Sequence, residues 1–264
     1  MAPTIDVIRH AEATHNVTGD VYARDPVLTE RGEAQAYRLA RAYPHMARVR
    51  HVVCSPLRRA VRTALIAFED RLLGGQRAVL LPELQETGVR PSDVGQPRAV
   101  LEATFRPHVD ASALGDGRDG EGWCYKGPGS KYVPDVALVE ARAREARLFL
   151  RGLARAAPDD ARIVVVSHGG FLHFLTEDFA GLSERYFTAY GNTTMRSFQF
   201  ADLHGTDTDA TLVETEESCQ GLGFPCWASV SEEEKARLKS YAVARIESQK
   251  QVFDRMTRCN RRPM

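Results

Sequence analysis

Residues 163–170 read IVVVSHGG, four β-branched residues in a row followed at once by polar residues and glycine. An unbroken apolar run of this kind predicts a strand buried on both faces, as in the middle of a parallel sheet. Further short apolar runs lie at residues 5–8, 51–54 and 78–81, helical periodicity lies at residues 30–42, 57–69 and 135–156, and two short runs with a strand-like pattern lie at residues 195–203 and 210–216. The last two runs predict a hairpin at the sheet edge. Strands that alternate with helices predict an α/β fold with a mainly parallel central sheet flanked by helices.

Two other parts of the chain have patterns of their own. Residues 87–134 are rich in Gly, Pro and Asp and predict a long irregular segment inserted into the domain. From Ser231 onward the sequence predicts one amphipathic helix that begins at a serine cap. We therefore expect one α/β domain over residues 1–220 and a helical extension over residues 221–264 that packs on it.

The composition is that of an ordinary globular chain. Of 264 residues, 43% are hydrophobic, and 35 Lys and Arg balance 35 Asp and Glu. Nucleic-acid and membrane-surface binders usually carry a basic excess, so we expect neither partner and expect a small molecule instead. No apolar run approaches the roughly 18 residues that cross a bilayer, and the N-terminus lacks a signal-peptide pattern. These features predict a cytoplasmic protein.

The cysteines and the assembly state are less constrained. The five cysteines, at positions 54, 124, 219, 226 and 259, are odd in number and lack C-x-x-C spacing. This pattern predicts mostly reduced thiols and leaves open one bridge, between Cys219 and Cys226. A homodimer is also left open, because the sequence does not reveal the oligomeric state.

Polar residues follow the expected strands at their carboxyl ends. Arg9 and His10 follow the first strand, and Ser55 follows the second. Glu86 comes shortly after the third, and His168 comes directly after the buried run. Because ligands of parallel sheets bind where strands end and helices begin, we expect these side chains to meet in one site.

Five segments carry a pattern that is specific in combination. They read RHAE at 9–12, DPVLTERGEAQA at 25–36, SPLRRAVRTA at 55–64, LQE at 84–86 and VVSHGG at 165–170. Together they resemble the histidine phosphatase superfamily, also called phosphoglycerate mutase-like, and its phosphatase branch in particular. The resemblance covers roughly residues 4–180, extends to about residue 203, and implies the fold of that family. One departure is Ala11, where the family commonly has glycine.

The resemblance implies catalytic roles for five side chains. His10 would take a phosphoryl group as the nucleophile, and Glu86 would give a proton to the leaving group. Arg9, Arg59 and His168 would clamp the phosphate.

The chemistry of these residues agrees with the implied roles. A neutral imidazole, whose reference pKa is about 6.5, can attack phosphorus at physiological pH without a metal. Two arginines, with His168 if it is protonated, would neutralise a phosphate dianion. We therefore expect neither a metal nor a cofactor. Glu83, three residues before Glu86, is the nearest rival for the role of proton donor.

The resemblance also implies a substrate lid, because the family generally builds one between the proton donor and the second histidine. Here that segment is residues 87–134. Its arginines and histidine could add positive charge over the mouth of the site, at positions 90, 98, 106 and 108. The side chains expected to contact the substrate are Asn16, Gly169, Trp123 and Lys126.

Three functions remain in competition at this stage. The first is a metal-independent phosphatase that hydrolyses a small phosphorylated metabolite, a monoester or a pyrophosphate, through phospho-His10. The second is a mutase-type phosphotransferase, and the third is a family member redirected to non-phosphatase chemistry or to binding. The phosphate loop, dinucleotide turn and nucleophile elbow of other enzyme classes are absent from the sequence.

Overall fold

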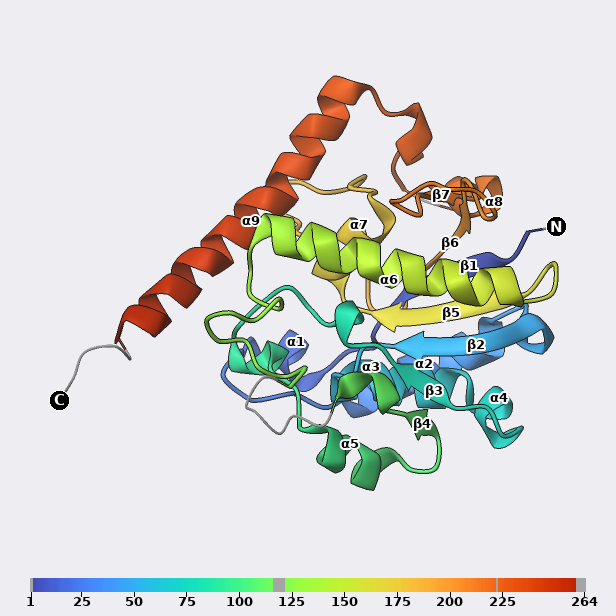
Figure 1. The fold of residues 1–264 in the computed structure, drawn as a ribbon, viewed down its shortest axis with the longest axis horizontal. Helices are drawn as coiled ribbons and strands as arrows, with labels where there is room; N and C mark the ends of the chain where they lie inside the picture. The colour runs from blue at the N-terminus through green and yellow to red at the C-terminus, as the bar shows by residue number, and fades with distance from the viewer. Residues whose placement is uncertain (1, 116–121, 222, 260–264) are drawn as a thin grey trace.

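The computed structural model describes residues 2–115, 122–221 and 223–259, and these contain one seven-stranded sheet (Figure 1). The strands are β1 (Thr4–Arg9), β2 (Val49–Cys54), β3 (Ala78–Leu80), β4 (Val109–Asp110), β5 (Arg162–Ser167), β6 (Met195–Phe200) and β7 (Leu212–Glu214). Their order across the sheet is β4-β3-β2-β5-β1-β6-β7. The first five in this order run parallel, whereas β6 and β7 pair antiparallel at one edge. The predicted α/β fold and edge hairpin are confirmed.

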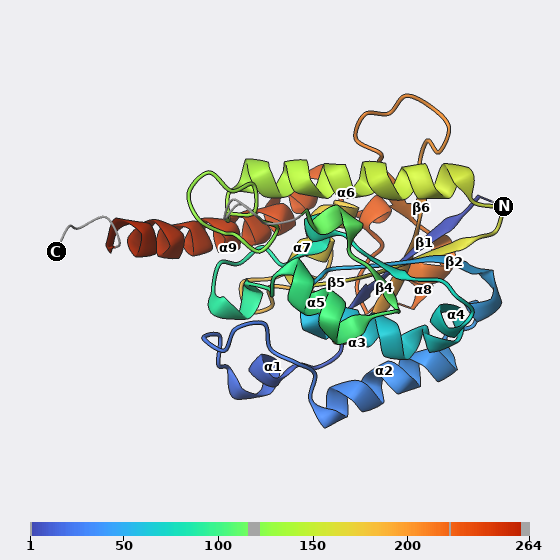
Figure 2. The ribbon, with the colours of Figure 1, turned by 60° about the horizontal axis from the view of Figure 1, so that its bottom comes forward.

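Helices cover both faces of the sheet. They are α1 (Thr14–Thr18), α2 (Glu30–Ala42), α3 (Arg58–Ala67), α4 (Glu69–Leu73), α5 (Arg98–Phe105), α6 (Val136–Ala156), α7 (Gly169–Thr176), α8 (Glu216–Gln220) and α9 (Glu232–Cys259). Figure 2 shows α6 and α9 on one side of the sheet and α2 and α3 on the other. Within the described residues, no helix combines the length and the apolar character needed to cross a bilayer.

The central strand β5 explains the layering, because successive side chains of a strand point to opposite faces. Ile163 and Val165 belong to the core cluster that contains residues of α6, α7 and α9. Val164 and Val166 belong to the cluster that contains residues of α3. All four side chains are fully buried, as the unbroken apolar run predicts.

The segment 87–134 is more regular than the sequence predicts. It contains α5 and the strand β4, which pairs parallel with β3 and extends the sheet by one strand. A two-residue strand leaves no periodic pattern, and its pairing depends on the neighbouring strand rather than on its own sequence. Residues 116–121, in the middle of the expected lid, lie outside the described residues.

The C-terminal helix α9 is docked on the domain by its apolar side chains. Leu238, Ala242 and Ile246 are buried in the same core cluster as α6 and α7. Ser231 precedes the helix, and its hydroxyl accepts a hydrogen bond from the backbone N–H of Glu234 at 3.3 Å. The helix predicted from Ser231 onward is therefore present. Figure 1 shows its second half running past the end of the sheet.

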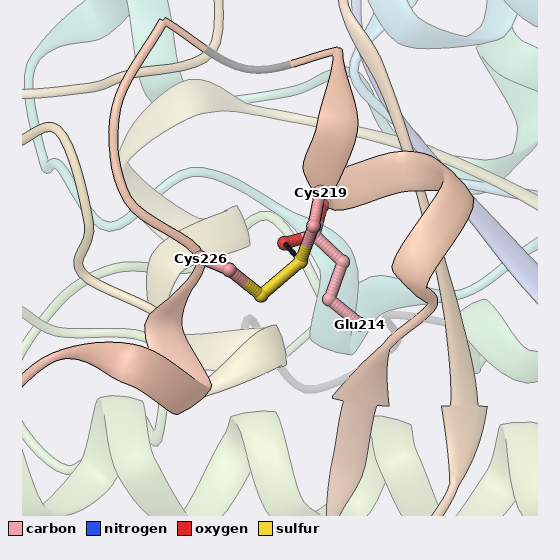
Figure 3. A group of neighbouring side chains, drawn as sticks. All are labelled: Glu214, Cys219 and Cys226. Carbon is pink, nitrogen blue, oxygen red and sulfur yellow. Dashed lines mark hydrogen bonds between the residues drawn. A yellow bond between two sulfur atoms is a disulfide. The ribbon is translucent and has the colours of Figure 1, made fainter.

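A disulfide between Cys219 and Cys226 ties α8 to the segment that leads into α9 (Figure 3). The bridge that the sequence leaves open is thus formed, whereas Cys54 and Cys124 are free thiols. The side chain of Cys259 lies outside the described residues. Glu214 lies beside the two sulfurs but pairs with Arg196, and the disulfide occupies both sulfurs, so this cluster offers no metal site in its oxidised form.

Ile246→Ala tests whether α9 is docked in solution. The change leaves a cavity where a side chain only 2% exposed now packs. We expect the free energy of unfolding to fall by roughly 2–5 kcal/mol in urea denaturation. The neighbouring exposed residue gives a matched control, since Glu247→Ala should change stability by less than about 0.5 kcal/mol. Equal stabilities of the two variants would show that the helix is not packed on the domain.

Candidate active site

The sheet places two histidines side by side. Arg9 at the end of β1 lies opposite Ser167 at the end of β5, so the chain leaves both strands at the same level. The backbone N–H of His10 donates to the Ser167 carbonyl at 2.9 Å. His10 and His168, the next residues along, have ring centroids 5.1 Å apart. On the other side of β5, the Ser55 hydroxyl lies 2.8 Å from His168 Nε2.

The hydrogen bonds of His10 define its tautomer. Its Nδ1 lies 2.7 Å from the Ala11 carbonyl oxygen, which can only accept, so Nδ1 carries the proton. Its Nε2 lies 3.3 Å from Nε of Arg59, which can only donate, so Nε2 holds the lone pair. Burial, followed by the charges of Arg59 and Arg9, lowers the pKa of His10 well below its usual 6.5. His10 is therefore a neutral imidazole with an unprotonated Nε2.

The two arginines next to His10 are held by different partners. Arg59, only 1% exposed, donates to the Ser92 carbonyl at 2.7 Å and pairs with Asp93 at 3.0 Å. Arg9 donates through Nη1 to the Tyr190 carbonyl at 2.7 Å. Both guanidinium groups are thus oriented by fixed contacts rather than left to solvent.

Three polar atoms around His10 are buried without any partner among the described residues: Arg9 Nε, His15 Nδ1 and His168 Nδ1. The His15 ring centroid lies 6.1 Å from that of His10. Burial, followed by the charges of Arg59 and Arg9, lowers the pKa of His15 to about 4. Burial, followed by the charge of Arg59, also lowers the pKa of His168. Unpaired buried polar groups are costly, and an oxyanion is the kind of ligand that donors in this arrangement would satisfy.

Glu86 lies at the N-terminus of α7. Its carboxylate accepts backbone N–H groups from Thr87 at 2.9 Å, Phe171 at 3.1 Å and Gly170 at 3.3 Å. A Cβ atom at position 170 would come within 2.8 Å of a carboxylate oxygen, so the second glycine of the SHGG segment permits this approach. The rival Glu83 instead forms an ion pair with Lys131 at 2.9 Å.

A cavity of about 370 Å³ joins these groups. Its lining residues are Arg9, His10, His15, Asn16, Val21, Arg59, Glu86, Val89, Arg90, Ser92, Asp93, Phe187, Arg245, Ser248, Gln249 and Val252. Four of the expected site residues, His10, Arg9, Arg59 and Glu86, therefore share one cavity with Asn16. His168 is fully buried and is not among the described residues that line the cavity, although its ring centroid lies 5.1 Å from that of His10.

Four cavity residues come from a place that the sequence analysis did not connect with the site. All four belong to α9. Ser248, Gln249 and Val252 lie three, four and seven residues after Arg245. This spacing places them on one face of the helix. The signal was present in the sequence, but a mixed polar stripe on a helix normally faces solvent. His15 and Asp93 were also missed.

Three predicted substrate contacts lie elsewhere. Trp123 is 4% exposed and packs in the core, where a Cβ on Gly95 would collide with its ring. Lys126 directs its ammonium group to the carbonyl oxygens of Glu86 and Gly88, at 3.1 and 2.6 Å. Gly169 is buried at the start of α7, behind Thr188. None of the three is among the described residues that line the cavity.

Among its described residues, the expected lid contributes only the first few to the cavity. Val89, Arg90, Ser92 and Asp93 line it, whereas Arg98 and Arg106 both pair with Glu102. The departure at Ala11 causes no backbone strain, because its φ lies outside the left-handed region.

The chain belongs to the histidine phosphatase superfamily (branch 1), whose family pattern matches residues 5–206. The resemblance inferred from the motifs is confirmed. As a member of this family the protein is a histidine phosphatase, that is, a phosphoric ester hydrolase. Helix α9 lies beyond the matched residues.

Individual relatives are distant. The protein named "Probable phosphoglycerate mutase GpmB" from Erwinia tasmaniensis is 28% identical over 177 residues, which are 67% of this chain and 74% of the relative. The ecdysone phosphate phosphatase of Bombix mori, solved with tungstate, has a TM-score of 0.51 at 16% identity over 75% of this chain and 89% of its own. A phosphoserine phosphatase mutant from Entamoeba histolytica has a TM-score of 0.48 at 20% identity over 81% and 95%. These structural similarities concern the fold.

The buried imidazoles predict how stability depends on pH. Burial lowers the pKa values of His10, His168 and His173, the last to about 4, so all three stay neutral in the folded state while the unfolded chain takes up protons near pH 6.5. These neutral imidazoles therefore contribute their full stabilisation above pH 6.5, and the free energy of unfolding falls as the pH drops towards their pKa values in the folded state. Each imidazole should remove about 1.4 kcal/mol between pH 7.5 and pH 5.5.

Urea denaturation in phosphate-free buffer at both pH values measures this loss, and phosphate is omitted because a bound ligand would add stability of its own. A free energy of unfolding that stays constant or rises on acidification would contradict the neutral state of these side chains.

Proposed function

We propose that the protein is a metal-independent phosphatase that hydrolyses a small phosphorylated metabolite through a phosphohistidine on His10. One observation carries the proposal: an unprotonated Nε2 on His10, beside two fixed guanidinium groups and unpaired polar atoms, in a cavity of about 370 Å³. Such a volume lies near the lower end of the roughly 300–1000 Å³ that small-molecule sites span.

In the first step, Nε2 of His10 attacks phosphorus and the ester P–O bond breaks. Arg9 and Arg59 hold the phosphate oxygens together with the unpaired nitrogen of the neutral His168, so that charge building up in the transition state meets two fixed guanidinium groups. The Ala11 carbonyl, which accepts the Nδ1 proton, supports the positive charge that develops on the imidazole ring. Glu86 acts as the general acid and gives a proton to the leaving oxygen.

In the second step, water attacks the phosphohistidine and the P–N bond breaks. Glu86, now a carboxylate, takes the proton from the attacking water, and inorganic phosphate leaves. The backbone N–H groups of Thr87, Gly170 and Phe171 stabilise the carboxylate form that this step requires. Dividing the displacement between two steps is the advantage of the histidine nucleophile.

A mutase-type phosphotransferase is the second candidate, and the relative named as a phosphoglycerate mutase favours it. The chemistry of the first step is the same. The two functions differ in whether water or a second hydroxyl of the substrate receives the phosphoryl group.

A panel of phosphate monoesters and pyrophosphates tests the nucleophile. We expect phosphate release and an acid-labile phosphoprotein, both reduced by roughly 10³-fold or more in His10→Ala. His204→Ala, which removes an exposed imidazole, is the control and should retain both signals. Product phosphorylated at a new position, seen by phosphorus NMR, would indicate the mutase. A folded wild-type protein without release or label would refute both functions.

Glu86→Gln tests the proton donor. Poor leaving groups need protonation, so we expect alkyl phosphates to lose roughly 10²- to 10⁴-fold in kcat/KM and an activated aryl phosphate to lose far less. Glu83→Gln serves as the matched control and should leave both substrates nearly unchanged. If Glu86→Gln slows alkyl and aryl esters equally, Glu86 is not the acid.

A further inference from the structure

Helix α9 is fixed with respect to the catalytic residues at several points. Beyond its buried apolar side chains, Lys239 pairs with Glu140 of α6 at 2.7 Å, and Lys250 pairs with Asp135. Nearer the site, the Thr87 hydroxyl donates to the side-chain oxygen of Gln249 at 3.3 Å. Because Thr87 follows Glu86 directly, α9 forms a wall of the cavity in a defined position.

Two arginines on the walls of this cavity have no acidic partner. Arg245 on α9 and Arg90 after the LQE segment both line the cavity, and neither side chain makes a hydrogen bond or ion pair with any residue in the described part of the chain. The guanidinium group of Arg245 lies 4.0 Å from the centre of the Phe187 ring. A planar guanidinium that stacks on an aromatic face is oriented while its N–H groups remain available.

The acidic residues of the cavity are already committed. Glu86 accepts backbone N–H groups, and Asp93 pairs with Arg59. No other aspartate or glutamate is among the described residues lining the cavity. The positive charges of Arg90 and Arg245 are therefore not balanced by the protein itself.

We infer that Arg245 and Arg90 form a second anion-binding subsite, so that the substrate carries a second anionic group in addition to the phosphate that His10 attacks. The inference rests on the proposed phosphatase function for the placement of the first phosphate. Arg90 lies within the family match, whereas Arg245 lies beyond its end at residue 206, so we assign the subsite to specificity and not to the shared chemistry.

The second group is a carboxylate or a second phosphate, since both accept paired N–H groups from a guanidinium. A neutral sugar or alkyl group in its place would leave both arginines unpaired. The subsite therefore predicts selectivity between compounds that differ only in this charge.

The test compares 3-phosphoglycerate with glycerol 3-phosphate, which has a hydroxymethyl group in place of the carboxylate, and with propane-1,3-diol bisphosphate. Binding of each compound to the folded His10→Ala protein is measured by calorimetry. Hydrolysis of p-nitrophenyl phosphate is measured in parallel with the protein that retains His10. We expect at least one compound with two anionic groups to bind at least 10-fold more tightly than glycerol 3-phosphate. Which of the two binds better identifies the second group.

Arg245→Gln should remove most of this preference, by roughly 10-fold or more, and leave kcat/KM for p-nitrophenyl phosphate within about threefold. Arg245→Lys should restore part of it. Arg237→Gln removes the same charge two turns earlier on α9, from a side chain that pairs with Glu234 and is not among the described residues lining the cavity, and should change nothing.

Equal binding of all three compounds by the Arg245-containing protein would overturn the inference. So would an equal loss for all compounds in Arg245→Gln, which would assign Arg245 a structural role. Because binding is measured without turnover, failure of the subsite is distinct from failure of the phosphatase function, which would appear as absent hydrolysis of p-nitrophenyl phosphate.

Discussion

Parallel pairing of β1 with β5 is the constraint on which the site depends. Because Arg9 lies opposite Ser167, the chain leaves both strands at one level and the next residues are the two histidines. A slip of one residue would turn every side chain of β1 to the opposite face, and His10 would lose its contact with His168. The fully buried side chains of β5 alternate between the two core clusters and so hold this register. The catalytic geometry is thus determined by the most strongly specified part of the fold.

The same geometry concentrates positive charge in a buried place, which opposes folding. The protein reduces this cost in three ways: it keeps His10 and His168 neutral, pairs Arg59 with Asp93, and satisfies Arg9 with a backbone carbonyl. What remains are polar atoms with no partner and an excess of donors. A bound oxyanion would accept hydrogen bonds from these donors, so part of the free-energy cost of leaving them unpaired becomes affinity for the ligand.

Local patterns predicted most of the fold and the polar residues at the strand ends, because apolar periodicity and strand ends are properties of short segments. The roles of those residues came from the resemblance to the family. The local patterns failed where the outcome depends on packing between distant segments. Trp123 was expected to contact the substrate, but only the tertiary structure shows that its ring packs against Gly95 and does not line the cavity. The two residues of β4 carry no pattern of their own. The polar stripe from Arg245 to Val252 resembles a solvent-facing helix surface until the cavity beneath it is known.

Chemistry and recognition therefore reside in parts of the chain that are anchored separately. The sheet edge supplies the proposed nucleophile His10 and its guanidinium partners within the residues matched by the family, whereas α9 lies outside that match and rests on α6 through its own apolar contacts. A substitution on the cavity face of α9 can alter which molecule fits without disturbing the tautomer of His10, which depends only on Ala11 and Arg59. In the part of the chain that the structure describes, a hydrogen bond between Thr87 and Gln249 joins the two parts next to Glu86, the proposed proton donor. Through that contact, α9 lies directly against the residue that follows Glu86 and donates to its carboxylate.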